Sequence, residues 1–231
     1  MIDRPVDVEL LDDPGANPAA VRAELRDIAW ANRWLGGTRA VVTALEPLFA
    51  REARTGSSRR WTLLDVGTGA GDIPAALRAV ARRHHIDLVP IGLERIPAAA
   101  RLARERGVHT MVADGDALPF RDRTVDVVIA SQVLHHLPRR TAVRWIAAFD
   151  RLARRAVVIA DLYRSRFAMA GVWLGATVLG KSRTSRHDAV VSLRRGYTLR
   201  DLERLLDAAG VRAAVRRRRW SRLVAMWTPE A

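Results

Sequence analysis

Residues 63–71 read Leu-Leu-Asp-Val-Gly-Thr-Gly-Ala-Gly, an apolar run that leads directly into a glycine-rich turn. The aliphatic residues predict a short buried strand, and the glycines follow it at every second position. A helix is predicted to begin near Ile73-Pro74, because proline suits the first turn of a helix. Glycines allow a tight turn and a close approach to a ligand, and the first N–H groups of a helix have no partner within it. The stretch therefore predicts a site for a nucleotide-like cofactor between the strand and the helix.

The spacing of these glycines is Gly-x-Gly-x-Gly, because Asp72 stands where the dinucleotide-binding fingerprint Gly-x-Gly-x-x-Gly has its last glycine. A glycine loop of this kind, taken alone, also fits an ordinary tight turn between a strand and a helix. The residues farther along the chain are needed to decide between these interpretations.

The whole chain has 231 residues, which suits one domain with a sizeable core. Hydrophobic residues make up 49% and charged residues 28%, the balance of a globular protein. The absence of cysteine excludes disulfides, thiolate zinc sites and cysteine nucleophiles. No His and carboxylate group has metal-ligand spacing, so we expect no metal. Residues 1–13 are acidic and lack the apolar segment of a signal peptide, so we expect a cytoplasmic protein.

The formal net charge of +14 is of the kind that favours nucleic acid or an anionic membrane surface as a partner. However, Lys181 is the only lysine, and arginine is spread through every predicted helix. A biased genome composition explains this pattern equally well. The densest basic run, Arg216 to Arg219, is typical of a solvated strand edge, where charge discourages edge-to-edge pairing. We therefore expect no nucleic-acid partner.

Strands and helices alternate along most of the chain. Residues 18–53 predict two helices that are separated at Gly36-Gly37. After them we expect strands at 61–66, 87–93, 108–112, 125–130 and 156–161, with helices at 73–84, 97–106 and 140–153 between them. A helix at 198–209 and an antiparallel pair of strands at 211–217 and 222–227 complete the pattern. This alternation predicts an α/β fold with a parallel, doubly wound sheet covered on both faces.

The domain organisation follows from where this rhythm starts and where it is interrupted. We expect an N-terminal helical cap at 1–54 and a main domain at 55–231, with an insertion at about 162–196. Within the insertion, residues 167–180 are strongly apolar but too short to span a membrane. They predict a helix that caps the active site, touches a membrane as a peripheral segment, or forms a contact in a homodimer. In the N-terminal cap, Trp30 and Trp34 are expected to anchor the helix that carries Asn32 and Arg33.

Acidic residues end several of the predicted strands, and ligands of open parallel sheets bind beyond these carboxyl ends. Asp65 ends the first strand. Glu94 ends the second, 23 residues after Gly71, where it can accept hydrogen bonds from both hydroxyls of a ribose. Alternatively, Glu94 forms an exposed pair with Arg95. Asp114, after the third strand, is placed to accept from an adenine amino group, with the Gly115 backbone beside it, although a simple acidic turn is the alternative.

These motifs, together with residues 125–137, resemble those of the class I S-adenosylmethionine-dependent methyltransferases. The resemblance covers about residues 55–161 and extends weakly through Arg-Gly-Tyr-Thr-Leu at 195–199. It implies a Rossmann-like seven-stranded sheet whose last strand is antiparallel, and a glycine loop that holds the methionine part of S-adenosylmethionine. The cofactor-binding residues that it implies are Asp65, Gly67, Thr68, Gly69, Gly71, Asp72, Glu94, Arg95, Asp114, Gly115, Ser131 and Gln132. The family's Pro-Gly-Gly turn before strand five is absent, and Arg154-Arg155 stands there, in a loop that we expect to be remote from the cofactor.

Two histidines, His135 and His136, follow the fourth strand, and Asp161 closes the fifth. An aspartate at one strand end can reach a histidine at the next, where it would hold the imidazole tautomer and stabilise the imidazolium. The segment resembles that of sugar and natural-product O-methyltransferases with Leu-His-His and a later Ala-Asp. This resemblance implies that His135 is the general base, oriented by Asp161, with His136 as the second candidate. Alternatively, both histidines cap the strand and contact the backbone.

The remaining histidines carry less functional meaning. We expect His84, His85 and His109 at the surface, whereas His187-Asp188 lies in the insertion and could touch a substrate.

The function predicted from these features is methyl transfer to a hydroxyl of a lipophilic or aromatic small molecule, such as a phenol, a quinone or a polyketide. The apolar segment 167–180 motivates the choice of substrate, because pockets for such ligands are mainly apolar. The first alternative is C-methylation of a quinone or polyketide. Nucleic-acid methylation is a second, although residues 131–134 lack an Asn-Pro-Pro-Tyr-type motif. The third is a non-catalytic cofactor-binding or membrane-associated module.

Overall fold

The computed structural model describes residues 10–13, 15–55, 59–165 and 191–230. The apolar segment 167–180 and His187-Asp188 therefore lie outside the described residues, and their predicted roles stay predictions.

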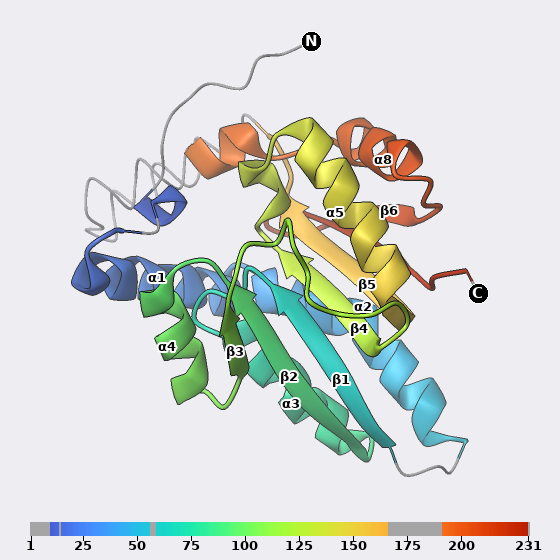
Figure 1. The fold of residues 1–231 in the computed structure, drawn as a ribbon. Coiled ribbons are helices and arrows are strands. Elements are labelled where there is room, and N and C mark those ends of the chain that lie inside the picture. Colours follow the sequence, from blue (N-terminus) through green and yellow to red (C-terminus); the bar gives the residue numbers. More distant parts are fainter. Residues whose placement is uncertain (1–9, 14, 56–58, 166–190, 231) are drawn as a thin grey trace.

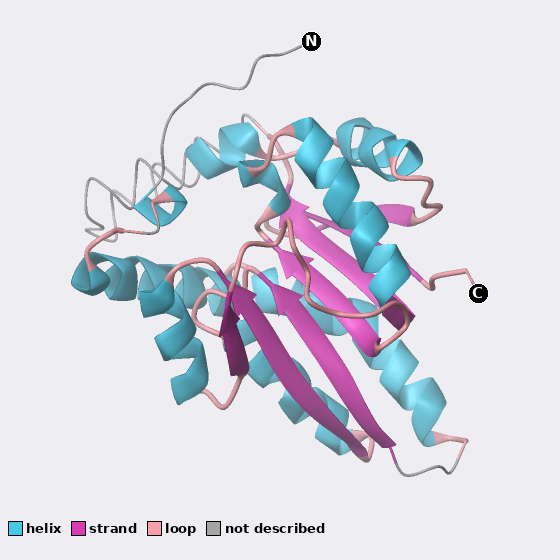
Figure 2. Ribbon diagram, viewed as in Figure 1, coloured by secondary structure: helices cyan, strands magenta, loops and turns pink. Residues whose placement is uncertain are grey.

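The described chain forms a seven-stranded sheet in the order β3-β2-β1-β4-β5-β7-β6, seen in Figure 2 as the layer between two sets of helices. The strands are β1 (Arg59–Val66), β2 (Ile86–Glu94), β3 (His109–Val112), β4 (Val125–Ser131), β5 (Ala153–Leu162), β6 (Ala214–Arg218) and β7 (Arg222–Trp227). All pairings among β1 to β5 are parallel, and β7 is antiparallel to both β5 and β6. The predicted mixed sheet with an antiparallel last strand is thus confirmed.

The order of the strands reverses beside β1, which places a binding site at one edge of the sheet. From β1 the chain proceeds outward to β2 and β3, and it then returns to β4 on the other side. The loops that follow β1 and β4 therefore diverge at the carboxyl edge. A crevice opens at such a switch point, and it is where open α/β sheets bind ligands.

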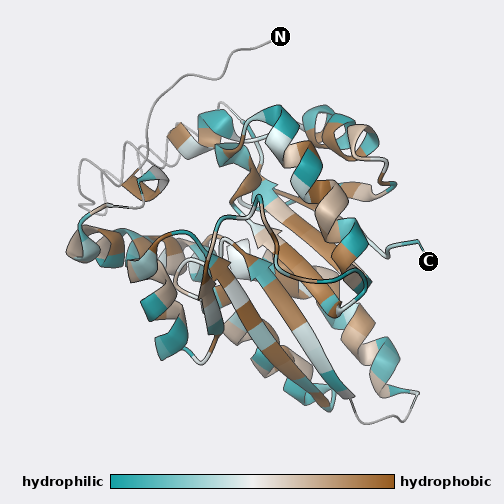
Figure 3. Cartoon of the chain, viewed as in Figure 1, coloured by the Kyte–Doolittle hydropathy of each residue, from teal (hydrophilic) through white to brown (hydrophobic). Residues whose placement is uncertain are grey.

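Helices cover both faces of the sheet. They are α1 (Pro18–Trp34), α2 (Gly37–Ala53), α3 (Asp72–Arg83), α4 (Pro97–Glu105), α5 (Arg139–Leu152) and α8 (Leu199–Ala208), with short 3₁₀ turns η1 (Leu10–Asp12) and η2 (Leu134–His136). Leu63 packs with α2 and α3, whereas its neighbour Leu64 packs with α5 and α8. Val127 and Val128 divide in the same way. Because both faces are buried, the middle of these strands is mainly apolar, and Figure 3 shows brown segments there, with teal and pale segments toward the strand ends.

Helix α1 is attached differently from our expectation. Trp30 and Trp34 are 41% and 60% exposed, so the prediction that they anchor the helix is wrong. The buried residues are Val21, Glu24, Leu25 and Asn32, which recur at steps of about one or two helical turns and so share one face. The tryptophans fall outside this face. Arg33 is exposed, and its guanidinium lies 5.4 Å from the centre of the Trp34 ring.

The junction of α5 and β5 contains no separate turn at Arg154 and Arg155. The helix ends at Leu152 and the strand begins at the next residue, so Arg154 and Arg155 lie in β5 instead of a loop. Arg155 contacts Asp126 at 3.1 Å and Glu52 at 3.2 Å, which balances its charge. Both arginines stand at the end of β5 opposite to Asp161, as the prediction of a remote position requires.

Among the described residues, no helix combines the length and the apolar character that a membrane crossing needs.

Candidate active site

A cavity of about 1170 Å³ lies at the carboxyl edge of the sheet, between α1, the loops after β1, β2, β3 and β4, and the start of β7. Small-molecule sites usually measure about 300–1,000 Å³. The cavity therefore has room for a cofactor together with a second reactant. The predicted site residues line it, with the exceptions of Gly71 and Asp161.

The glycine loop follows β1 along the cavity. Gly67 has a positive φ of 75°, and a Cβ atom there would stand 2.4 Å from Val133 Cγ2. Only glycine fits both the backbone conformation and this close approach. The N–H groups of Gly67 and Thr68 donate to the carbonyl of Leu93 at 2.8 and 3.2 Å, which ties the loop to β2. Gly71 stands behind the loop, where a Cβ would meet Ala103 of α4 at 3.0 Å.

Asp65 is a buried carboxylate beneath this loop. Thr68 Oγ1 donates to its Oδ2 at 2.8 Å, whereas its Oδ1 has no hydrogen-bond partner among the described residues. Burial raises the pKa of Asp65 to about 7; the Thr68 hydrogen bond opposes the shift, and the negative charges of Asp72 and Glu94 add to it. A buried carboxylate with one oxygen that accepts no hydrogen bond from the described residues can bind a cation or a hydrogen-bond donor.

Glu94 lies at the end of β2, 8% exposed. Gly69 N–H donates to its Oε2 at 2.9 Å, and Ile96 N–H donates to its Oε1 at 3.0 Å. Each carboxylate oxygen can accept a further hydrogen bond, so these contacts orient Glu94 and still allow the predicted ribose contact. The neighbouring Arg95 is exposed and lines the cavity.

The segment after β3 forms another part of the wall. Asp114 is exposed there and accepts from the Asp116 N–H at 3.0 Å. Gly115 is held against the Trp145 ring, where a Cβ would come within 2.2 Å. Trp145 Nε1 in turn donates to Asp116 at 2.8 Å. The turn is therefore fixed by α5, and the adenine contact of Asp114 stays a prediction.

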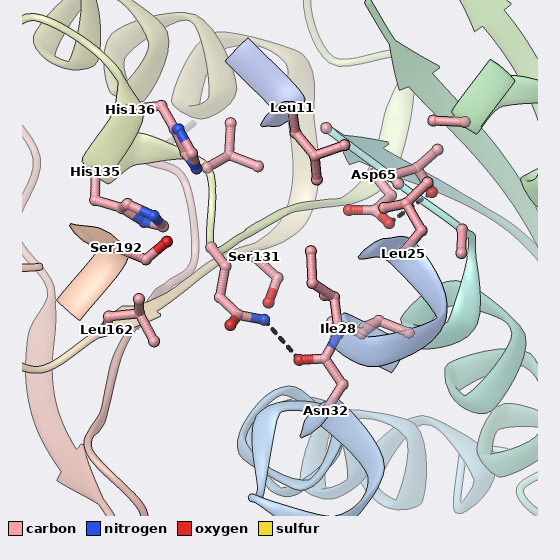
Figure 4. Close-up of a pocket in the computed structure, with 18 of the residues that line it drawn as sticks. Leu11, Leu25, Ile28, Asn32, Asp65, Ser131, His135, His136, Leu162 and Ser192 are labelled. Carbon is pink, nitrogen blue, oxygen red and sulfur yellow. Dashed lines mark hydrogen bonds between the residues drawn. The ribbon is translucent and has the colours of Figure 1, made fainter. Parts of the chain in front are cut away.

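The end of β4 brings Ser131 and Gln132 to the cavity. Ser131 Oγ is buried with no hydrogen-bond partner among the residues that the structure describes. Gln132 has a left-handed backbone (φ 57°), unusual for a residue other than glycine. Its side-chain Nε2 donates to Asn32 Oδ1 at 2.6 Å, the dashed line in Figure 4. Asn32 Nδ2 donates to Asp72 at 3.1 Å, so α1 contacts both the turn after β4 and the start of α3.

The structure brings together the two residues predicted as a base and its orienting acid. His135 Nδ1 lies 2.7 Å from Asp161 Oδ1, and the side chains are 1% and 0% exposed. The backbone N–H groups of His135 and Leu162 also donate to Asp161, at 3.3 and 2.7 Å. Burial alone would raise the pKa of Asp161, but the charge and hydrogen bond of His135 and the Leu162 N–H outweigh it, so the pKa lies below its usual value.

His136 is stacked on this pair, with 4.2 Å between the two ring centres. Arg195 Nη1 lies 3.3 Å from His136 Nδ1. Because a guanidinium only donates, this contact makes Nδ1 the acceptor atom of His136. Figure 4 shows His135 and His136 beside the cavity, opposite Asn32 and Leu25 of α1. His85 and His109 are exposed and His84 is partly so, as predicted for surface residues.

Arg222 is a residue of the site that the sequence did not reveal. It opens β7 with 5% exposure, and its Nη1 donates to Gln132 Oε1. Burial lowers its pKa to about 10, while the negative charge of Asp161 opposes that shift. Nothing in the sequence separates it from the surrounding arginines, because its place depends on the antiparallel return of β7 beside β5. In the described part of the chain, no three His or acidic side chains are grouped so as to hold a metal.

Several known proteins that resemble this chain in sequence or in fold are methyltransferases. Residues 64–157 match the model of a methyltransferase domain. An uncharacterized methyltransferase of Mycolicibacterium vanbaalenii is 41% identical over 91 residues, which are 37% of this chain and 33% of that protein. A probable tRNA methyltransferase 9B of Homo sapiens is 32% identical over 106 residues, 46% of this chain and 20% of that protein. The matched part of the chain thus spans a third or less of the length of these two relatives.

Solved structures share the fold over a larger part of the chain. A SAM-dependent methyltransferase from Aquifex aeolicus has a TM-score of 0.55 at 16% identity and covers 91% of this chain and 97% of its own. Magnesium protoporphyrin IX methyltransferase from Synechocystis, solved with bound SAM, has a TM-score of 0.53 at 14% identity and covers 96% and 98%. Residues 64–157 thus match a methyltransferase-domain model, and the chain shares its fold with these two solved methyltransferases.

Proposed function

We propose that this chain transfers the methyl group of S-adenosylmethionine to a hydroxyl of a lipophilic or aromatic small molecule, with His135 as the general base. The observation that carries the proposal is the short contact between His135 Nδ1, at the wall of the cavity, and Asp161, which is buried behind it. A carboxylate only accepts, so Nδ1 carries the proton and Nε2 carries the basic lone pair.

The chemistry needs such a base. When bound, S-adenosylmethionine supplies a methyl group on a positively charged sulfur, which a neutral hydroxyl attacks poorly. His135 Nε2 would take the proton of the acceptor hydroxyl, and the cofactor would supply the methyl group and leave as S-adenosylhomocysteine. Asp161 then faces an imidazolium, whose charge it balances. The buried setting strengthens this interaction, because little water screens it.

The residues around the glycine loop suit the cofactor. Asp65 Oδ1, which accepts no hydrogen bond from the described residues, would accept one from the ammonium group of the cofactor. Glu94 would accept hydrogen bonds from the ribose hydroxyls. Asp114 and Gly115 would contact the adenine. The acceptor would lie farther toward β7, where Leu162, Leu193 and Trp220 give the cavity an apolar wall. This lining supports a lipophilic acceptor.

Three single variants test the assignment of the base. His135→Ala and Asp161→Asn should lower turnover by about 10²–10⁴-fold, the usual contribution of a general base and its orienting partner. Their affinity for S-adenosylhomocysteine should stay near that of the wild type. His136→Ala is the matched control and should keep most of the turnover. If His136→Ala is the inactive variant, or if His135→Ala retains turnover, the role of His135 is wrong.

C-methylation on the same scaffold is distinguished by the product. An NMR spectrum assigns the new methyl group to an oxygen or a carbon, and a carbon-bound methyl would replace the proposal of a hydroxyl target.

Methylation of RNA is the second candidate, favoured by the relatives described as probable tRNA methyltransferases and by the net charge of +14. It requires affinity for RNA that falls steeply as salt rises, because each phosphate contact releases counterions. Transfer of labelled methyl groups to tRNA, with none to phenols or quinones, would support it in place of the small-molecule proposal.

A further inference from the structure

Four polar side chains from separate segments form a continuous chain along the cavity wall. Asn32 Nδ2 of α1 donates to Asp72 Oδ2, at the start of α3, over 3.1 Å. Gln132 Nε2, just after β4, donates to Asn32 Oδ1 over 2.6 Å. Arg222 Nη1, at the start of β7, donates to Gln132 Oε1. We call this set the amide relay.

The two ends of the amide relay determine its direction. A guanidinium has donors only, and a carboxylate has acceptors only. With Arg222 at one end and Asp72 at the other, a single orientation of the Asn32 and Gln132 amides satisfies all three links. A reversed amide at either position would place two donors or two acceptors against each other.

The relay is built into the packing of the molecule. Asn32 and Arg222 are 3% and 5% exposed. A Cβ on Gly37 would stand 2.3 Å from Asn32 Oδ1, so the first residue of α2 is one that leaves room for this amide. Buried polar networks whose groups are all paired are rigid, whereas a broken link leaves a buried group that is costly to desolvate.

The relay joins the two halves of the site. Asp72 follows the glycine loop directly, on the cofactor side. Gln132 stands three residues before His135, and its backbone N–H donates to the Ala160 carbonyl at 2.8 Å, next to Asp161. The negative charge of Asp161 also acts on Arg222, where it opposes the lowering of the pKa by burial. A displacement of the α1 amide would therefore reach both the glycine loop and the turn that leads to His135.

We propose that Asn32 is a positioning residue, which holds the turn carrying His135 in the geometry set by the cofactor loop. Its importance for catalysis rests on the proposed function. The coupling itself does not need turnover or a known acceptor, so the two ideas can fail separately.

A swap of two isosteric side chains tests the relay. Asn32→Asp keeps the volume but sets two carboxylates against each other. Asp72→Asn alone keeps the relay, because its amide oxygen still accepts from Asn32, and it is the reference for any affinity lost at Asp72 itself. In the double variant Asn32→Asp/Asp72→Asn, the new amide at 72 donates to the new carboxylate at 32, which also accepts from Gln132. All three hydrogen bonds are thereby restored, and only the one between residues 32 and 72 has its donor and acceptor exchanged.

Two readouts are measured on each variant: the affinity for S-adenosylhomocysteine by calorimetry, and the ¹⁵N-imidazole signals of His135 in the ligand-free protein, assigned with His135→Gln. Asn32→Asp should weaken binding about tenfold, of the size expected for a lost charge-assisted hydrogen bond, and displace the His135 signals. The double variant should recover the His135 signals and should bind at least as tightly as Asp72→Asn alone, which measures any affinity lost at Asp72 itself.

A role in packing alone predicts no rescue of Asn32→Asp by Asp72→Asn. The relay is overturned if the His135 signals of Asn32→Asp coincide with those of the wild type, or if the double variant is no better than the single one. If Asn32→Asp does not fold, recovery of folding in the double variant is the rescue, and its absence overturns the relay. A wild type that binds no S-adenosylhomocysteine refutes the proposed function instead, and the His135 signals still decide the relay.

Discussion

Asp65 concentrates much of the electrostatics of the cofactor site in one residue. Its pKa of about 7 exceeds the ordinary value of 3.8, because burial disfavours the charged form. The native state therefore binds more protons than the unfolded state between these values, so the contribution of Asp65 to stability falls as the pH rises through this window. A cationic ligand reverses the preference, because it stabilises the ionised carboxylate.

We therefore expect S-adenosylmethionine to bind more tightly as the pH rises from 5.5 to 7.5. The gain approaches tenfold per pH unit below about pH 7 and levels off above it. Calorimetry across this range measures the slope. Asp65→Asn, which cannot ionise, should bind more weakly and show a flat profile. A wild-type affinity independent of pH, or an equal slope in the variant, would contradict the placement of the ammonium group at Asp65.

Single residues show how far sequence reasoning reaches into the site. The pairing of His135 with Asp161 was predictable, because both follow neighbouring parallel strands. The partners of Asn32 were not, since Asp72 and Gln132 lie 40 and 100 residues farther along the chain. Arg222, which completes the relay, lies 190 residues from Asn32. The prediction that Trp30 and Trp34 are anchors was wrong, because it considered only that they are apolar. Val21 and Leu25 define the buried face of the helix, and the two tryptophans lie outside that face.

At the scale of the elements, the glycine loop owes its form to a close contact as well as to its backbone angles. Gly67 and Gly210 have nearly the same φ, 75° and 73°. A Cβ at 67 would collide with Val133, whereas a Cβ at 210 would meet nothing within 4 Å. These two positions separate the cost of the left-handed backbone from the cost of the contact.

Gly210→Ala should lower the free energy of unfolding by about 1–2 kcal/mol, from backbone strain alone. Gly67→Ala should lose a further 1–3 kcal/mol or so from overpacking and should lose cofactor affinity. Urea unfolding measures both variants. Val133→Ala combined with Gly67→Ala should recover part of the additional loss. Equal losses at 67 and 210 would show that the contact with Val133 has no energetic weight.

The elements themselves were largely predictable, because strands buried on both faces and helices with one apolar face have different periods. The boundary between α5 and β5 was not. Arg154 and Arg155 suggest a polar loop, but the charge of Arg155 is balanced by Asp126 and Glu52 across the packed structure, a tertiary effect with no local signature.

At the scale of the whole molecule, the fold follows from the alternation of strands and helices and from the antiparallel return of β7. The same return brings Arg222 beside Asp161 and completes the amide relay. The acceptor is the part that a fold does not specify, since one scaffold serves many substrates. The glycine loop, the His135–Asp161 pair and the apolar wall toward β7 lie around one cavity, as a methyl transfer between two bound reactants requires.

The measurement that tests this account most directly is calorimetric titration of S-adenosylmethionine and S-adenosylhomocysteine into the wild type and into the Asp65→Ala/Glu94→Ala double variant, with folding checked by circular dichroism. The account predicts that the wild type binds both ligands and that the folded double variant binds neither. A wild type without affinity for either ligand, or a double variant that binds as well as the wild type, would contradict a cofactor site at the glycine loop.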